Sequence, residues 1–468
     1  MRPEHRGAPA VDGVSGFLDV LRESDDLMEI SEPVAPRFEI GAVLGMLGEQ
    51  AGPAALFTNV AGYPGVRVVG NVLGRRRRLA QALGVGEGEL SRVYLERRKD
   101  RLRPHVVARR TEGSTTKTGT DVDVFRQLPA LTHHEGDSSP YLTCTVAIAR
   151  DPDTGELNMG LHRVQVRSER TLAIYLQTPP LSGFMERARR QARPLQIALV
   201  NGIHPATVIA AVTWCPQGQS KLEMAGGLLG GPLALVECQA VDLQVPLDSQ
   251  YLIEGVIEPE HRGAEGVFGE SSGIYVEGVE SPIVQVKSLT WRRDPLYQGL
   301  QPWSSEDDAL FNLCFGSDLL ERLRVDFPFI EDLHVVGGTV CAHVVVRVGQ
   351  CSPESLRAVM EEALTHNPFV KKIVAVNDDI DIRSAREVEW AVATRFQAGR
   401  DLLVLTGIPG SPIDPSTGRG GLTTKIAVDA TFRTEQWAAF HRVSIDSGSS
   451  RRARSIIDGI VSRSSGEE

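Results

Sequence analysis

Two glutamates bracket a short segment that contains glycine, Glu265-Gly-Val-Phe-Gly-Glu270. Such a turn can bring the backbone close to a ligand. Two carboxyl groups beside an arginine can also differ in protonation, one paired and ionised and the other able to donate a proton. Upstream, Asn158-Met-Gly-Leu-His-Arg163 leads into an expected strand with Arg163 and Gln165 on one face. An acid–base site is therefore one interpretation, and two surface glutamates beside a loop explain the spacing equally well.

Two other patterns suggest different chemistry. Gly269-Glu270-Ser271-Ser272-Gly273 matches the nucleophile elbow G-x-S-x-G, which would make Ser271 the nucleophile of a serine hydrolase. That elbow needs a strand before it and a helix after it, whereas extended structure is expected after Gly273. His133-His134-Glu135 could ligate a metal, but adjacent side chains rarely converge on one ion, so a loop is favoured. The sequence contains no P-loop, H-E-x-x-H or C-x-x-C motif.

Composition limits the classes of function. The chain has 468 residues and a formal net charge of −10, which argues against binding nucleic acid over a broad surface. The six cysteines are scattered without C-x-x-C pairing, as expected of reduced thiols in a cytoplasmic protein. The first residues lead into no apolar signal region, and no run of 18 apolar residues occurs, so neither export nor a membrane span is expected.

The elements that must position these residues fall into successive regions. Helical periodicity and two strand-like runs predict a small α/β domain over residues 1–115. Short β-branched stretches at close intervals predict a β-barrel-like domain over residues 116–300, followed by a helical linker over residues 301–325. Alternating strands and helices predict a second α/β domain over residues 326–446, with Ser352 capping a helix that begins at Pro353. A polar tail over residues 447–468 is expected to be flexible.

At its two candidate motifs the chain resembles the UbiD-type decarboxylase family, enzymes that use prenylated FMN to remove carboxyl groups from unsaturated acids. That family carries N-x-G-x-x-R and E-G-x-[FY]-G-[ED] at about this separation. Further likeness extends along nearly the whole chain, from Ala54-Ala-Leu-Phe-Thr-Asn to Gly421-Leu-Thr-Thr-Lys425. The resemblance implies an amino-terminal α/β domain, a split β-barrel flavin-binding domain, a helical linker and a carboxy-terminal α/β domain that mediates self-association.

The resemblance also implies roles for individual residues. Arg163, Glu265 and Glu270 match the catalytic Arg-Glu-Glu network, with Glu270 as the proton donor. Thr143 and Asn158 match positions along the cofactor. Lys425 matches a contact to the flavin phosphate, and a lysine suits a point-charge phosphate partner in a chain with only 7 Lys among its 50 basic residues.

The match fails at the metal site. Family members usually hold a divalent cation, Mn²⁺ or Mg²⁺, against the flavin phosphate with the Asn, a His and a Glu. Here the His region reads Gln177-Thr178-Pro179-Pro180 and the Glu position is Lys221. Asn158 alone remains as a possible metal ligand, so a divalent metal and K⁺ stay open, and Lys221 is expected to contact the cofactor instead. A local shift that makes Glu223 the ligand is the alternative.

The function implied is reversible, non-oxidative decarboxylation of an α,β-unsaturated or aromatic carboxylic acid. Glu270 at the second acidic position favours an acrylic or dienoic acid. A flavin prenyltransferase would supply the cofactor, and at least a homodimer is expected. A catalytically altered flavin-binding protein of the same fold, or a serine hydrolase using Ser271, are the alternatives.

Overall fold

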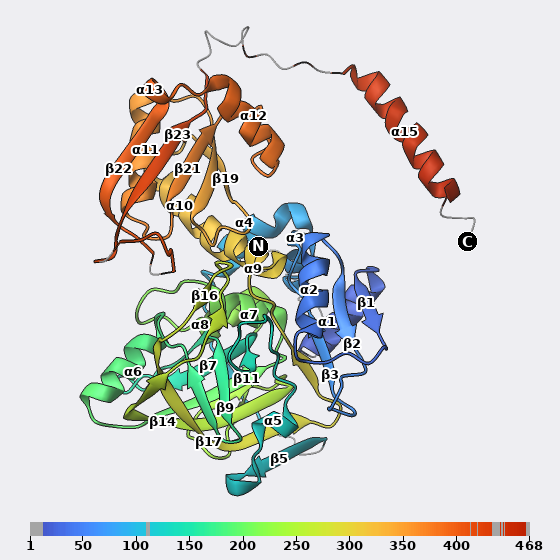
Figure 1. Ribbon diagram of the computed structural model, residues 1–468, viewed down its shortest axis with the longest axis vertical. Helices are drawn as coiled ribbons and strands as arrows, with labels where there is room; N and C mark the ends of the chain where they lie inside the picture. The colour runs from blue at the N-terminus through green and yellow to red at the C-terminus, as the bar shows by residue number, and fades with distance from the viewer. Residues whose placement is uncertain are drawn as a thin grey trace, which may run out of the picture.

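The computed structural model describes residues 13–108, 113–411, 413–418, 420–432, 440, 443 and 445–464. The amino end, where no signal region was expected, and the last four residues of the predicted tail lie outside the described residues. Figure 1 shows a central curved sheet with the amino-terminal domain at its side and the carboxy-terminal domain beyond the linker helices. The predicted class, mixed α/β and β, is confirmed.

The amino-terminal domain is built on a four-stranded sheet in the order β1-β2-β3-β18. Its last strand comes from far along the chain, because Tyr297 of β18 pairs in parallel with Val68 of β3. The elements are β1 (Leu27–Ile30), β2 (Ala54–Phe57), β3 (Arg67–Gly70), β18 (Leu296–Gln298), α1 (Gly13–Glu23), α2 (Glu39–Glu49), α3 (Arg76–Ala82), η1 (Glu87–Glu89) and α4 (Leu90–Arg97).

The central domain is a nine-stranded sheet in the order β6-β9-β10-β17-β14-β11-β7-β8, with β5 paired to β17. In the described residues this order has free ends at β6 and β8, so the predicted split barrel does not close. The strands are β5 (Ser114–Thr118), β6 (Tyr141–Leu142), β7 (Thr145–Arg150), β8 (Leu157–Leu161), β9 (Val164–Ser168), β10 (Thr171–Ile174), β11 (Leu195–Asn201), β14 (Tyr251–Ala264) and β17 (Glu280–Arg292).

Helices and two small sheets complete the central domain. Apolar residues of α1, α3, α7, α8 and the linker belong to one buried cluster, so the first two domains and the linker share a core. The remaining elements are η2 (Gly119–Asp121), α5 (Val124–Gln127), α6 (Leu181–Arg190), α7 (Pro205–Val212), α8 (Lys221–Leu229), the sheet of β4 (His105–Val106), β12 (Ala234–Glu237) and β13 (Gln244–Pro246), and the hairpin of β15 (Phe268–Gly269) and β16 (Tyr275–Val276).

The linker and the carboxy-terminal domain follow. Ser352 accepts a hydrogen bond from the Ser355 N–H and Pro353 begins the helix, as the sequence predicted. The linker elements are α9 (Ser305–Phe311), η3 (Asn312–Gly316) and α10 (Ser317–Asp326). The domain has a sheet in the order β19-β20-β21-β23-β22, formed by β19 (Ile330–Val335), β20 (His343–Val348), β21 (Lys372–Val376), β23 (Leu422–Asp429) and β22 (Leu402–Pro409), with helices α11 (Pro353–Thr365), α12 (Ala385–Arg395) and α13 (Ala398–Asp401).

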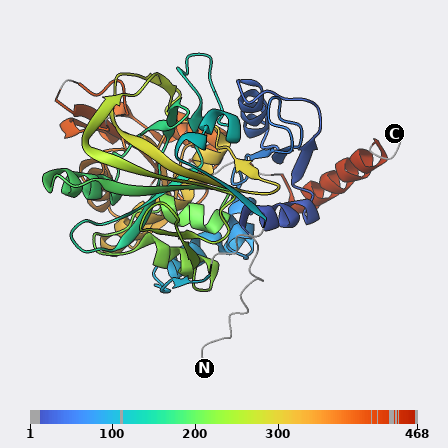
Figure 2. The same cartoon turned by 90° about the horizontal axis from the view of Figure 1, so that it is seen from below.

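Most of the region expected to be a flexible tail forms a helix. Helix α15 (Ser447–Ser464) stands apart from the three domains in Figure 1, and in the view of Figure 2 one end of it overlaps the amino-terminal domain. Ile456 and Ile457 are exposed on it. The structure does not test the other predicted domain boundaries, which stay predictions. None of the helices in the described residues combines the length and apolar character that a membrane crossing requires.

Candidate active site

One guanidinium group joins the two predicted carboxylates. Arg163 lies between β8 and β9, and its Nε donates to Glu265 Oε1 at 2.7 Å. Its Nη1 forms an ion pair with Glu270 Oε1. The two glutamates lie on either side of β15, so the turn between them brings both carboxylates to the same arginine. The structure thus assembles the three residues that the motifs singled out.

The two carboxylates differ in their surroundings. The side chain of Glu265 is fully buried, and its second oxygen accepts a hydrogen bond from the Ser281 hydroxyl at 2.9 Å. The side chain of Glu270 is 16% exposed, and its second oxygen accepts from the Ser271 N–H at 3.2 Å. Glu265 is therefore enclosed by permanent partners, while Glu270 is the carboxyl group that a ligand can reach.

Aromatic rings hold the arginine in place. The guanidinium carbon of Arg163 lies 4.2 Å from the ring centre of Tyr175 and 5.0 Å from that of Phe268. These are distances at which a cation is attracted to a ring face. In the part of the chain that the structure describes, no hydrogen bond involves Nη2 of Arg163, so this nitrogen can contact a ligand. Sequence reasoning missed Tyr175 and Ser281, since neither stands in a recognisable motif.

The structure contradicts the nucleophile elbow. Ser271 lies in the turn of the two-stranded β15–β16 hairpin, whereas the elbow joins a strand to a helix. The Gly273 N–H closes this turn on the Glu270 carbonyl at 2.9 Å. The Ser271 side chain lies beside the carboxyl group of Asp307 in the linker. The serine-hydrolase interpretation loses its geometric basis.

Asn158 and Lys221, two of the residues expected at the cofactor, lie side by side. The side-chain oxygen of Asn158 accepts the N–H groups of Met159 and Lys221, each at 3.0 Å. Its amide nitrogen donates to the Gln219 carbonyl at 2.8 Å. Lys221 is 5% exposed, its Nζ donates to the Ala211 carbonyl at 2.7 Å, and burial lowers its pKa to about 8.

This arrangement does not fit a divalent cation. The Asn158 oxygen already has two donors, and the neighbouring side chain is an amine where an acidic ligand is needed. Glu223, the alternative ligand, is partly exposed, and its charge adds to the effect of burial in raising the pKa of Glu156. Within the described residues no three His, Cys, Asp or Glu side chains are grouped to hold a metal.

An anionic group fits the same place better. The Lys221 amine has three donors but only one hydrogen-bond acceptor among the described residues. The ring of His162 donates from Nδ1 to the Tyr175 carbonyl at 2.9 Å, and its buried Nε2 has no partner there. Burial, with a smaller effect of the Lys221 charge, lowers the His162 pKa to about 4. Lys221 is thus a buried cation with unfilled hydrogen-bonding capacity.

Thr143 lies between β6 and β7, beside the two adjacent histidines. Its hydroxyl accepts the Leu300 N–H at 3.1 Å and lies 3.4 Å from Nε2 of His133. Nδ1 of His133 bonds to Oε1 of Gln301 at 2.8 Å, and burial lowers the His133 pKa to about 4. His133 and His134 form part of a hydrogen-bonded loop and not of a metal cluster, in agreement with the favoured interpretation.

Lys425 is not brought to the other candidate residues. It lies on β23 in the carboxy-terminal domain with its side chain fully buried. Its Nζ donates to the carbonyls of Leu364 at 2.9 Å and Asn367 at 2.6 Å, at the end of α11. The carbonyls at a helix carboxyl end lack partners and favour a cation. These carbonyls account for the lysine in this structure, and its expected contact to a flavin phosphate stays a prediction.

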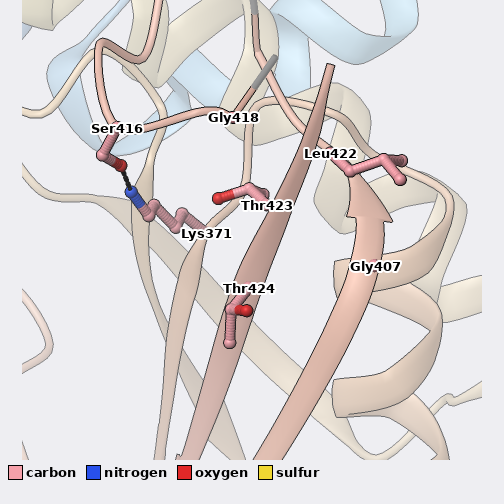
Figure 3. Close-up of a pocket in the computed structure, with 7 residues that line it drawn as sticks. All are labelled: Lys371, Gly407, Ser416, Gly418, Leu422, Thr423 and Thr424. Atoms are coloured by element: carbon pink, nitrogen blue, oxygen red, sulfur yellow. Dashed lines mark hydrogen bonds between the residues drawn. The ribbon is translucent and has the colours of Figure 1, made fainter. Parts of the chain in front are cut away.

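A separate hollow of about 430 Å³ lies in the carboxy-terminal domain (Figure 3). Lys371 lies at its wall and points toward Ser416, and its amine also pairs with Asp414 at 2.7 Å. None of the candidate residues lines this hollow. The Arg163 cluster therefore remains the candidate active site.

Known proteins resemble this chain over nearly its whole length. Three domains described for 3-octaprenyl-4-hydroxybenzoate carboxy-lyase match it, namely the N-terminal domain at residues 18–97, the Rift-related domain at 106–304 and the C-terminal domain at 314–430. A phenolic acid decarboxylase from a Streptomyces species is 30% identical over 441 residues, covering 90% of this chain and 92% of the relative. An anhydromevalonate phosphate decarboxylase from Methanothermobacter thermautotrophicus is 32% identical over 319 residues, covering 68% and 75%.

Solved structures agree with this result. The UbiD-class enzyme HmfF from Pelotomaculum thermopropionicum, in complex with FMN, has a TM-score of 0.88 and 34% identity, covering 92% of this chain and 97% of that one. An evolved dimeric form of the same enzyme, in complex with prFMN, has a TM-score of 0.84 and 32% identity, with 93% and 97% covered. The family match and the similarity to these decarboxylases define a carboxy-lyase. The chain belongs to the UbiD family of decarboxylases.

Proposed function

We propose that this protein is a reversible, non-oxidative decarboxylase of an α,β-unsaturated or aromatic carboxylic acid, and that it uses prenylated FMN. The observation that carries the proposal is the cluster in which Arg163 binds Glu265 and Glu270 at once. Membership of the family supports the class of reaction. Solved neighbours that contain FMN and prFMN support the cofactor.

Each residue of the cluster has a separate role in the proposed reaction. Nη2 of Arg163 is free to bind the substrate carboxylate, and Glu265 with Tyr175 keeps the guanidinium in orientation. Prenylated FMN, when bound, supplies an electron sink for the carbon–carbon bond that breaks. Glu270, the more exposed of the two carboxyl groups, delivers the proton that takes the place of CO₂ on the substrate carbon. The acid RCO₂⁻ and one proton thus become RH and CO₂.

Contacts to the cofactor are proposed for Thr143, Asn158 and Lys221. The spare donors of the Lys221 amine suit a phosphate oxygen, because lysine binds phosphate as a point charge. Asn158 positions Lys221 by accepting its backbone N–H. A buried lysine in this place would supply part of the charge that a metal supplies in other members of the family.

The proposal also covers the supply of the cofactor, the oligomeric state and the class of substrate. A flavin prenyltransferase would make the cofactor, and the chain would act as a homodimer or a higher oligomer. Exposed Leu402 and Val404 on the edge strand β22, and helix α15 standing away from the domains, offer surfaces for association. An acrylic or dienoic acid is the favoured substrate. Related chains are decarboxylases of phenolic acids and of anhydromevalonate phosphate.

The test compares the parent with Glu270→Gln, both produced together with a flavin prenyltransferase. A panel of cinnamic, dienoic and hydroxybenzoic acids is screened for CO₂ release, and for deuterium incorporation in D₂O. We expect the Gln variant to keep its flavin spectrum and to lose about 10² to 10⁴ in rate, the usual size of a general-acid effect. Turnover within twofold of the parent would remove Glu270 from the mechanism. A yellow parent that is inert on every acid would favour the non-catalytic flavin-binding alternative.

A further inference from the structure

The hairpin that carries Glu270 is joined to a loop more than a hundred positions earlier in the chain. The Ser138 N–H donates to the Val267 carbonyl at 2.9 Å, and the Gly136 N–H donates to the Tyr275 hydroxyl at 3.0 Å. The hairpin has only two short strands of its own, β15 and β16. A two-stranded hairpin is marginally stable by itself, so its position depends on these outside contacts.

Asp137 joins the loop to the hairpin through three hydrogen bonds. Its side chain is fully buried, and its Oδ2 accepts the N–H groups of His133 at 3.0 Å and His134 at 2.9 Å. Its Oδ1 accepts the N–H of Gly269 at 2.8 Å. Gly269 immediately precedes Glu270. One carboxylate thus holds the loop together with one oxygen and holds the residue before Glu270 with the other.

The surface of the loop is shaped to receive Gly269. A Cβ atom at this position would lie 2.3 Å from Nδ1 of His134, so only glycine lets the backbone approach the ring. The ring is held from its far side by Gln301, whose Nε2 lies 3.0 Å from His134 Nε2. Gln301 also holds His133, which keeps both rings in the loop.

We propose that Asp137 is a positioning residue for the reaction, which places Glu270 by holding the Gly269 N–H against the loop. This inference rests on the proposed role of Glu270. Charge-assisted hydrogen bonds to backbone N–H groups are about twice as strong as neutral ones. Because general acid catalysis requires the acid within hydrogen-bond reach of the substrate, a displaced hairpin lowers the rate while Arg163 still binds the carboxylate.

Asp137→Asn is the test variant. Three N–H donors converge on the two carboxylate oxygens, so the amide NH₂ of Asn must face at least one of them. Glu254→Gln is the matched control. Glu254 is also fully buried and accepts three backbone N–H groups, from Gln239, Ala240 and Val241, all on Oε2. Its Oε1 has no hydrogen-bond partner among the described residues, so the Gln side chain can keep all three bonds while the buried charge is removed away from the hairpin.

Two measurements are made on each variant. Hydrogen–deuterium exchange of residues 266–276 is followed in the flavin-free protein, where we expect about tenfold or more acceleration in Asp137→Asn and none in Glu254→Gln. Steady-state kinetics of the loaded enzyme should show kcat lowered by about 10- to 100-fold in Asp137→Asn, with KM within about twofold. Unchanged exchange in Asp137→Asn, or an equal loss of kcat in Glu254→Gln, would overturn the proposal.

A second pair of variants keeps the test decisive if Asp137→Asn does not fold. Gly269→Ala forces the hairpin away from His134, and His134→Ala removes the ring that it would meet. We expect fast exchange in Gly269→Ala and recovery of most protection in the double variant. Failure to recover would show that the loop does not set the position of the hairpin. Exchange does not depend on turnover, so an inactive parent would count against the proposed function while leaving this result interpretable.

Discussion

Replacing Arg163 by methionine should destabilise the protein strongly, and replacing Glu265 as well should restore most of the loss. Methionine keeps an unbranched apolar side chain beside Tyr175 and Phe268 but removes the cation. Glu265 then keeps only the Ser281 hydroxyl as a partner, with its side chain fully buried. Glu270 loses the same cation but is 16% exposed and can turn to solvent. The loss of folding stability therefore comes mainly from the unpaired charge of Glu265.

The size of the effect follows from the burial of this pair. Removing one partner of a buried ion pair costs about 3 to 5 kcal/mol, because the other charge remains buried and unpaired. For a domain of the size spanned by residues 106–304, about 1 kcal/mol moves Tm by about 2 to 4 °C, so we expect Tm to fall by about 6 to 20 °C. In Arg163→Met/Glu265→Gln no buried charge is left, and the neutral amide can still bond to Ser281. Both variants lose the contact of the cation with Tyr175, so their difference isolates the charge.

Differential scanning calorimetry of the flavin-free parent, Arg163→Met, Glu265→Gln and the double variant provides the assay. The Tm of the unfolding transition that includes the central domain is compared among the four proteins at pH 7.5. A Tm of Arg163→Met within about 2 °C of the parent would show that the ion pair is not buried as described. A double variant as unstable as Arg163→Met would place the loss in packing against the aromatic rings, and would refute the electrostatic argument.

Two further predictions concern buried charges. Lys221→Glu should release FMN on gel filtration unless Mn²⁺ is added, because an acidic side chain repels the phosphate and creates a metal ligand. The parent should keep FMN in the presence of EDTA. Stoichiometric manganese that EDTA removes from the parent together with the flavin would contradict this prediction. Burial raises the pKa of Glu306 from 4.5 to about 7. Between these two pH values the native state therefore binds more protons than the unfolded state. The stability that the protonated Glu306 contributes below pH 4.5 is lost as the pH rises through 7. Glu306→Gln should therefore match the parent in Tm near pH 4.5 and exceed it by several °C at pH 8, and a Tm difference that does not change with pH would contradict the assignment.

Local patterns predicted the parts of the molecule that depend on neighbours in sequence. Helix α11 follows from Ser352, Pro353 and an apolar stripe, since capping and periodicity act within a few residues. The approach of Arg163 to Glu265 and Glu270 followed from two motifs and their resemblance to a family. The pairing of β18 with the amino-terminal sheet could not be predicted, because no residue near Tyr297 indicates that its partner is Val68.

The surroundings of Lys425 could not be predicted from the sequence for a similar reason. Its rarity as a lysine in an arginine-rich chain indicated a special role, but the sequence could not show which group it serves. In the structure the open carbonyls at the end of α11 take the amine, and these lie about sixty positions earlier. Asp137 was overlooked for the opposite reason, because an aspartate among Gly, Ser and Pro is typical of an exposed turn. The residue that bonds to its Oδ1, Gly269, lies more than a hundred positions later in the chain.

The first turn of α9 ties the active-site hairpin to both flanking domains. Successive residues of a helix point about 100° apart, so Glu306, Asp307 and Asp308 face three directions. Glu306 accepts the Leu73 N–H of the amino-terminal domain at 2.7 Å, and Asp308 accepts the Gly338 N–H of the carboxy-terminal domain at 2.8 Å. Between them Asp307 lies beside the side chain of Ser271, the residue after Glu270. A rotation of either domain about this helix must therefore break one of these bonds or carry the hairpin with it, which makes the placement of Glu270 a property of the whole chain.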